Sequence, residues 1–159
     1  DVAMGPLANS RQLASIEQFV ADTAGSGARL VTGGNRIGNQ GYFYQPTVFA
    51  DVPDAARIMQ EEPFGPVVPF QSFDDFDDVL TRANNTPFGL AGYVMTRSLL
   101  RSEELSDGIE AGMVVVNHFS VSTPYSPFGG VKESGDGLEG GIEGLEAYLV
   151  SKTITTRYA

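Results

Sequence analysis

The sequence contains no cysteine, and this absence limits the chemistry that the chain can perform by itself. Without a thiol there is no disulfide, no thiolate nucleophile and no thiolate metal ligand. The absence fits a reducing compartment, so we expect a cytoplasmic protein. His118 is the only histidine, which rules out a metal site built on two histidines, and we expect it to be structural.

Basic residues are also scarce. The chain has 10 lysines and arginines against 20 aspartates and glutamates, for a net charge of −10. An acidic surface repels phosphate backbones and anionic lipid head groups, so we expect neither a nucleic-acid nor a membrane partner. No apolar run approaches the ~20 residues that a membrane-spanning helix needs.

What is present is enough to build a core. The 159 residues include 42% apolar and 10% aromatic residues, which suits one domain or a piece of a larger one. The first residues, from Asp1 to Met4, show neither an initiator methionine nor a signal-peptide pattern, so we expect a piece of a longer protein.

Hydrophobic spacing predicts alternating helices and strands. Apolar residues at helical spacing predict a helix over residues 10–23, with Asn9 as its cap and Gln12 as the reciprocal capping-box partner. A second helix is predicted to open at Ser72 with Asp75 in the capping box. Further helices are predicted near residues 99–105 and 142–148, and strands at 28–32, 47–49, 67–73, 90–96 and 113–116.

This alternation predicts an α/β fold, with a parallel-type sheet and flanking helices. Residues 113–116 form an apolar run without alternation, as expected of a strand covered on both faces. The tail over residues 148–159 contains β-branched residues and no helix follows it. An uncovered terminal strand often pairs with another subunit, so we expect an oligomerisation strand and a homo-oligomer.

A cluster of aspartates over residues 74–78 could suggest a metal site. Carboxylates at the start of a helix are also favoured by the backbone dipole. We therefore interpret the cluster as a solvated helix start and expect no metal.

The first loop that could carry chemistry is Glu61-Glu62-Pro63-Phe64-Gly65-Pro66. Its prolines and glycine restrict the backbone, so the side chains of Glu62 and Phe64 have little freedom to move. A fixed carboxylate can accept hydrogen bonds from paired ribose hydroxyls, and a fixed phenyl ring can pack on a flat heterocycle. The local chemistry also allows Phe64 to be a core residue beside solvent-facing glutamates.

The second loop follows the apolar run and leads to Ser126-Pro127-Phe128-Gly129-Gly130-Val131-Lys132. In open α/β sheets, ligands bind beyond the carboxyl ends of strands, so this loop is the best candidate for substrate contact. Its double glycine could equally bind phosphate, although the surrounding residues do not match a specific phosphate-binding motif.

Six phrases, taken together, resemble the C-terminal part of the aldehyde dehydrogenase superfamily, and they occur in the family's order across nearly the whole chain. The phrases are Met4-Gly5-Pro6-Leu7, residues 41–48, Glu61 to Pro66, residues 83–90, Gly112 to Asn117 and Pro127 to Gly137. The resemblance is nearest to succinate-semialdehyde dehydrogenases. It implies that residues 1–147 are the C-terminal part of the catalytic domain and that residues 148–159 are the oligomerisation strand.

The resemblance also implies roles for four residues. Glu62 would bind the nicotinamide ribose and Phe64 would pack beside the nicotinamide of NAD or NADP. Phe128 would line the substrate tunnel. Ser122 lies at a tunnel position where relatives acting on succinate semialdehyde carry serine, so the implied substrate is that aldehyde or a similar acid-bearing one. A hydroxyl can donate to a carboxylate, which fits this assignment.

The family mechanism uses a thiolate that attacks the aldehyde, a hydride transfer to the nicotinamide and an activated water. The family's catalytic cysteine, its general-base glutamate and its dinucleotide-binding domain all precede the matched segment. No catalytic residue is therefore expected in this chain, which should be inactive without the missing N-terminal part of the enzyme. The chain also has Gly137-Leu138-Glu139 where the family usually has Gly-Arg-Glu, which affects a subunit-contact region.

An alternative function, from a different class, is a non-catalytic assembly or binding module that keeps the dehydrogenase fold. The terminal strand would support it through subunit pairing. A longer parent protein with an upstream cysteine would favour the enzyme.

Overall fold

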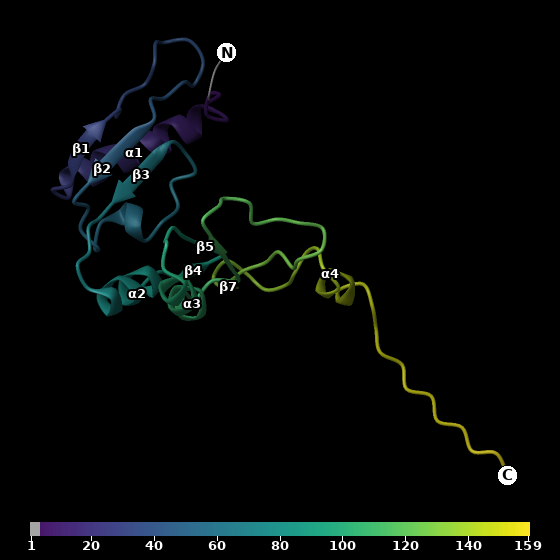
Figure 1. The fold of residues 1–159 in the computed structure, drawn as a ribbon. Helices are drawn as coiled ribbons and strands as arrows, with labels where there is room; N and C mark the ends of the chain where they lie inside the picture. Colours follow the sequence, from purple (N-terminus) through teal and green to yellow (C-terminus); the bar gives the residue numbers. More distant parts are fainter. Residues whose placement is uncertain (1–3) are drawn as a thin grey trace. The chain divides into compact units, whose positions relative to one another are not determined.

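A computed structural model describes residues 4–159. Residues 1–3, with which the expected catalytic-domain segment starts, lie outside the described residues. The chain forms two compact units, one ending at Phe76 and the other comprising Asp77–Ala159 (Figure 1). The expected boundary between residues 147 and 148 stays a prediction.

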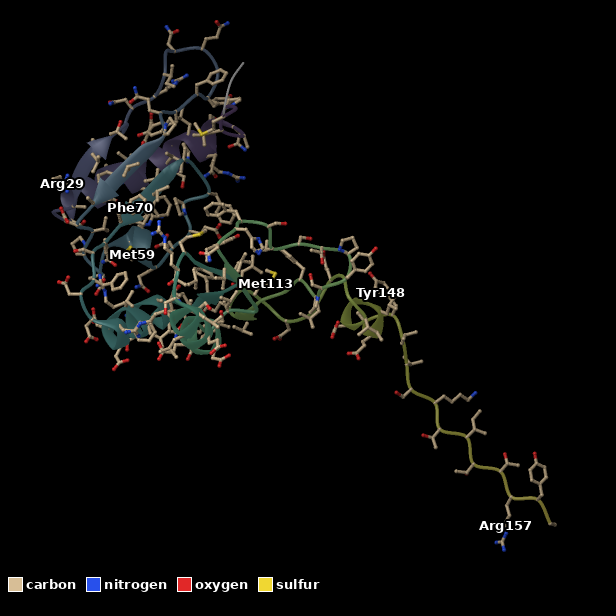
Figure 2. The ribbon with its side chains drawn as sticks, in the orientation of Figure 1. Arg29, Met59, Phe70, Met113, Tyr148 and Arg157 are labelled. Atoms are coloured by element: carbon tan, nitrogen blue, oxygen red, sulfur yellow. The ribbon has the colours of Figure 1, made fainter. Side chains whose placement is uncertain are left out.

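The first unit is a helix packed on a small sheet. Its strands are β1 (Arg29–Thr32), β2 (Thr47–Ala50) and β3 (Val67–Phe70), in the order β1-β2-β3, with α1 (Ser10–Gly25) against them (Figure 1). β1 is antiparallel to β2, and β2 is parallel to β3. Arg29 pairs with Ala50 and Ala50 with Phe70, so Arg29 and Phe70 lie at the same end of the sheet (Figure 2). The 3-10 helix η1 (Arg57–Met59) lies between β2 and β3.

Helix α1 forms where the sequence predicts it. The side chain of Asn9 accepts from the backbone N–H of Gln12 at 2.9 Å, which satisfies one of the free donors of the first turn. Leu13 and Ile16 are buried, as the helical spacing predicts. The predicted capping box is confirmed for Asn9 but not for Gln12. The Gln12 side chain donates to the carbonyls of another loop and forms no reciprocal bond with the backbone of Asn9.

The helix covers one face of the sheet. Thr47, Phe49 and Val67 are buried among the residues that face α1. Val68 and Phe70, which point to the opposite face because strand side chains alternate, are 47% and 56% exposed. The core of this unit is therefore confined to the side of the sheet that α1 covers.

The second unit combines short strands with three helices. Its elements are α2 (Phe76–Asn84), β4 (Phe88–Gly89), β5 (Ala91–Val94), α3 (Leu99–Gly108), β6 (Met113–Val116), β7 (Val131–Lys132) and α4 (Glu143–Glu146). β5 and β6 pair in parallel with α3 as the connection between them, whereas β4 and β7 pair antiparallel. The expected parallel-type sheet is thus only partly right: across the described residues the sheets are mixed.

Two further expectations need correction. The second helix begins at Phe76 instead of Ser72. In β6, Met113 and Val115 are buried while Val114 and Val116 are half-buried. The parallel pairing of this strand is confirmed, but within the unit the strand is well covered on one face only, so an unbroken apolar run does not guarantee cover on both.

The tail beyond α4 extends as an open chain from Tyr148 to Arg157 (Figure 2). Tyr148, Val150 and Tyr158 are 86%, 94% and 90% exposed, and the tail contains no assigned strand. Its role in oligomerisation stays a prediction. Over residues 4–159, no helix is both long and apolar enough to cross a membrane.

Candidate functional site

The turn that carries Glu62 and Phe64 lies between η1 and β3 in the first unit. The Phe64 ring is 72% exposed, so the interpretation of Phe64 as a core residue is wrong. Its backbone has φ 48°, in the left-handed region that non-glycine residues rarely adopt. Glu62 is exposed and forms no hydrogen bond or ion pair with any described residue. The turn therefore presents a free carboxylate and a free phenyl ring two residues apart.

One side chain holds the backbone of this turn. The Nε2 amide of Gln12 donates to the carbonyl oxygens of Pro63 at 3.0 Å and Phe64 at 2.8 Å. The turn also lies directly on α1, because a Cβ added at Gly65 would come within 2.3 Å of the Ile16 Cδ1. Only glycine allows this close approach, since any larger residue would force Ile16 to move.

Arg57 fixes the start of the same turn. Its guanidinium donates to the carboxylates of Glu61 at 2.9 Å and Asp22 at 3.1 Å, and it stacks over the Phe19 ring at 4.1 Å. The side-chain hydrogen bonds to Glu61 and Asp22 raise the pKa of Arg57. A hydrogen bond from Gln18, followed by that from Arg57, lowers the pKa of Asp22 below its ordinary range. Of the two adjacent glutamates, Glu61 is therefore engaged.

The second loop begins after β6 at Asn117, a residue held by two side-chain hydrogen bonds. Asn117 has φ 61°, and its side chain accepts from Thr96 N–H and donates to Thr96 C=O, both at 2.9 Å. This pair of bonds ties the end of β6 to the end of β5. His118 follows, and its Nδ1 accepts from Ser120 N–H at 3.2 Å, a local structural contact. The loop that carries Ser122 therefore starts from a fixed point.

Ser122 and Phe128 line one open pocket of about 310 Å³, together with Thr123, Glu139 and other residues of the same unit. The backbone N–H of Phe128 donates to the Glu139 carbonyl at 2.6 Å, and the reverse bond measures 2.8 Å. Phe128 is half-buried and Ser122 is exposed. The pocket thus has an apolar wall and a hydroxyl at its rim.

The glycines after Phe128 serve packing. A Cβ at Gly112 would lie 2.0 Å from the Gly129 carbonyl oxygen, so the two segments approach as closely as backbones can. Lys132 forms an ion pair with Glu110 at 2.7 Å and donates to the Asn84 carbonyl at 2.8 Å. The Lys132 ammonium, two residues after the double glycine, is thus engaged by groups of the protein.

The structure brings the four expected site residues together in pairs. Glu62 and Phe64 share one turn of the first unit, while Ser122 and Phe128 share one pocket of the second. Gln12 and Arg57 support the turn, and the sequence alone did not predict this role for either residue. The local sequence indicates only a capping role for Gln12 and gives no signal for Arg57, because Pro63 and Asp22, which they contact, lie on distant segments.

The residues of the turn fit a nucleotide cofactor better than a metal. A free carboxylate can accept paired hydroxyls, and an exposed ring can pack on a planar heterocycle. No group of three or more histidine, aspartate or glutamate side chains close enough to hold a metal occurs among residues 4–159.

Comparisons with known proteins agree on one family. The model of the aldehyde dehydrogenase family matches residues 1–154. The 4-(hydroxymethyl)benzenesulfonate dehydrogenase TsaD1 of Comamonas testosteroni is 44% identical over 96% of this chain and 32% of its own length. The NADP⁺ succinate-semialdehyde dehydrogenase GabD of Escherichia coli is 42% identical over 95% of this chain and 31% of its own.

Solved structures agree as well. The Mycobacterium tuberculosis aldehyde dehydrogenase complexed with NAD⁺ is 41% identical, with a TM-score of 0.87 over 91% of this chain and 30% of that chain. The chain thus spans about a third of the length of the curated relatives that it matches.

The network around Arg57 predicts a pH-dependent contribution to stability. Because the folded-state pKa of Asp22 lies below the ordinary value of 3.8, its charge stabilises the fold above that pH and ceases to do so as the pH falls through the folded-state value. We expect Asp22→Asn to lower the melting temperature of the full-length protein at pH 7, with the difference narrowing below pH 3.8.

Asp51→Asn is the matched control. Asp51 pairs with Arg29 at 3.1 Å, but both side chains are largely exposed, so a small effect is expected. A loss of stability in Asp22→Asn that stays constant from neutral to acidic pH would contradict the prediction.

Proposed function

Because the chain belongs to the aldehyde dehydrogenase family, we propose that it forms part of an NAD(P)-dependent enzyme that oxidises an aldehyde to a carboxylic acid. The observation that carries this proposal is the turn with φ 48° at Phe64, which presents an unpaired Glu62 carboxylate and an exposed ring. Relatives with NAD⁺ bound in the crystal or NADP⁺ in their name support the choice of cofactor.

In this proposal Glu62 accepts hydrogen bonds from the ribose hydroxyls of the nicotinamide riboside, and the Phe64 ring packs beside the nicotinamide. When bound, the nicotinamide supplies the hydride acceptor of the oxidation. Both side chains act by orientation, which can provide much of a rate enhancement, because reacting groups must be held at near-attack distance.

The pocket of Ser122 and Phe128 is proposed to receive the substrate. A hydroxyl at the rim can donate to an anionic group, while the Phe128 ring provides an apolar wall. The names of two relatives describe substrates with an acidic group, a sulfonate and a carboxylate, which supports an acid-bearing aldehyde such as succinate semialdehyde.

The chain contributes no thiolate nucleophile, because it contains no cysteine. The thiolate and the general base are proposed to come from the remaining polypeptide of the enzyme, and this chain alone is expected to be inactive. A cytoplasmic location belongs to the same proposal.

The exposed tail is proposed to pair with a second copy of the enzyme in a homo-oligomer. Val150 and Ile154 are 94% and 75% exposed, and they are four positions apart in the extended chain, so both lie on one side of the tail. A role as a non-catalytic assembly module would use this same segment, and activity of the full-length protein decides between the two functions.

The ribose contact is tested by Glu62→Gln in the full-length enzyme. Loss of a charged acceptor should weaken NAD(P) binding by about 10- to 100-fold, as expected for hydrogen bonds to a charged group. Fluorescence titration or calorimetry would measure the dissociation constant. Glu103→Gln, which neutralises an exposed carboxylate on α3, is the control. Unchanged cofactor affinity in Glu62→Gln would refute the proposed cofactor site.

The substrate class is tested by Ser122→Phe. Replacing the hydroxyl by a ring should raise KM for succinate semialdehyde relative to that for an uncharged alkyl aldehyde, on the order of tenfold for one lost hydrogen bond to a charged group. Steady-state kinetics with both substrates gives the ratio. If the two KM values change in parallel, the serine does not select the acid.

The tail is tested by deleting residues 149–159 from the full-length enzyme. Removal of an intersubunit strand should reduce the oligomer to a smaller species in sedimentation or light-scattering measurements. A substitution of the exposed Lys152 by alanine serves as the control. An unchanged mass after the deletion would assign assembly to another surface.

A further inference from the structure

The backbone at Phe64 needs support from outside the turn. A φ of 48° is sparsely populated for a residue with a side chain, and such conformations persist only when the surrounding structure holds them. Residues Pro63 and Pro66 restrict their own φ but do not set that of Phe64. The support must therefore come from contacts made by other segments.

The Gln12 side chain binds the backbone on both sides of the Phe64 Cα. One amide group has two N–H donors, and the Gln12 amide donates to the carbonyls of Pro63 and Phe64 at 3.0 and 2.8 Å. These carbonyls belong to the peptide planes on either side of the Phe64 Cα. Fixing both planes fixes the φ and ψ of Phe64, and hence the direction in which its ring leaves the backbone.

Gln12 is itself held in place. It lies in the first turn of α1, where its N–H donates to the Asn9 side chain. One turn further along the same face, Ile16 is fully buried and contacts the turn at Gly65. The Gln12 amide and the Ile16 side chain, both on α1, therefore contact the backbone of the turn from which Glu62 and Phe64 project.

The other end of the turn is anchored to the same helix. Arg57 bonds Glu61 while pairing with Asp22 and stacking on Phe19, and both of these partners belong to α1. Because Glu61 is bound to Arg57, Glu62 is the one of the two adjacent glutamates whose carboxylate is free to bind a ligand. The two anchors enclose Glu62 and Phe64.

We infer that Gln12 is a positioning residue for the cofactor site, which holds the peptide planes around Phe64 so that the ring and the Glu62 carboxylate are presented together. This inference rests on the proposed function of that turn. Gln12 touches no substrate in this role, because both of its donors are used on backbone carbonyls.

The test compares three variants in the full-length enzyme. Gln12→Met keeps the length of the side chain but loses both donors, whereas Gln12→Lys retains an ammonium that can donate to both carbonyls. Gln40→Met is the matched control, because Gln40 is an exposed loop residue without a hydrogen bond among the described residues. The measurements are amide hydrogen exchange over residues 61–66, NAD(P) affinity, melting temperature, and kcat and KM for the aldehyde.

In Gln12→Met we expect faster exchange over residues 61–66 and a fall in kcat on the order of tenfold or more, as for a misplaced reacting group. The KM for the aldehyde should change little. Gln12→Lys should retain most of the protection and of kcat, and Gln40→Met should behave like the unaltered enzyme.

Two results would overturn the inference: normal exchange and kcat in Gln12→Met, or equal losses in the Met and Lys variants. The Glu62→Gln measurement separates this from failure of the proposed function. If Glu62→Gln weakens cofactor binding while Gln12→Met changes neither exchange nor kcat, only the positioning role is lost. If Glu62→Gln has no effect, the cofactor site itself is wrong.

Discussion

A strained backbone held by a distant amide determines how the first unit can present functional groups. Phe64 adopts φ 48° with its ring in solvent, so no burial of that ring compensates for the unfavourable conformation. The compensation comes from the backbone, through the two hydrogen bonds of Gln12 and the close contact of Gly65 with Ile16. Because the attachments involve main-chain atoms, the side chains of Glu62 and Phe64 remain available to a ligand.

In the second unit, residues with positive φ at both ends of the loop that contains Ser122 and Phe128 are also held by side-chain contacts. Asn117 has φ 61° where the loop leaves β6, and Lys132 has φ 56° where β7 ends. Each is held by its own side chain, Asn117 on the backbone of Thr96 and Lys132 on Glu110 and a helix-end carbonyl. These contacts fix both end points of the loop between them, so its sequence can vary without displacing them.

In the proposed enzyme, this chain supplies groups that orient the ligands, and the remaining polypeptide supplies the nucleophile. The chain has no thiol and offers orienting groups: a carboxylate, two rings and a hydroxyl. Such groups bind and align, and they need an external nucleophile. The chain belongs to the aldehyde dehydrogenase family and spans about a third of the length of its curated relatives.

The sequence by itself determined the local features: the Asn9 cap and apolar stripe of α1, the family phrases and the exclusion of thiol chemistry. These depend on residues within a few positions of each other. The tertiary structure alone decided that Gln12 serves a turn 51 residues away, that Glu61 and not Glu62 is engaged by Arg57, and that Phe128 pairs with Glu139. A polar side chain has many possible partners along the chain, and only the packing of α1, the sheet and the loops selects one, because hydrogen bonds reach only a few ångströms.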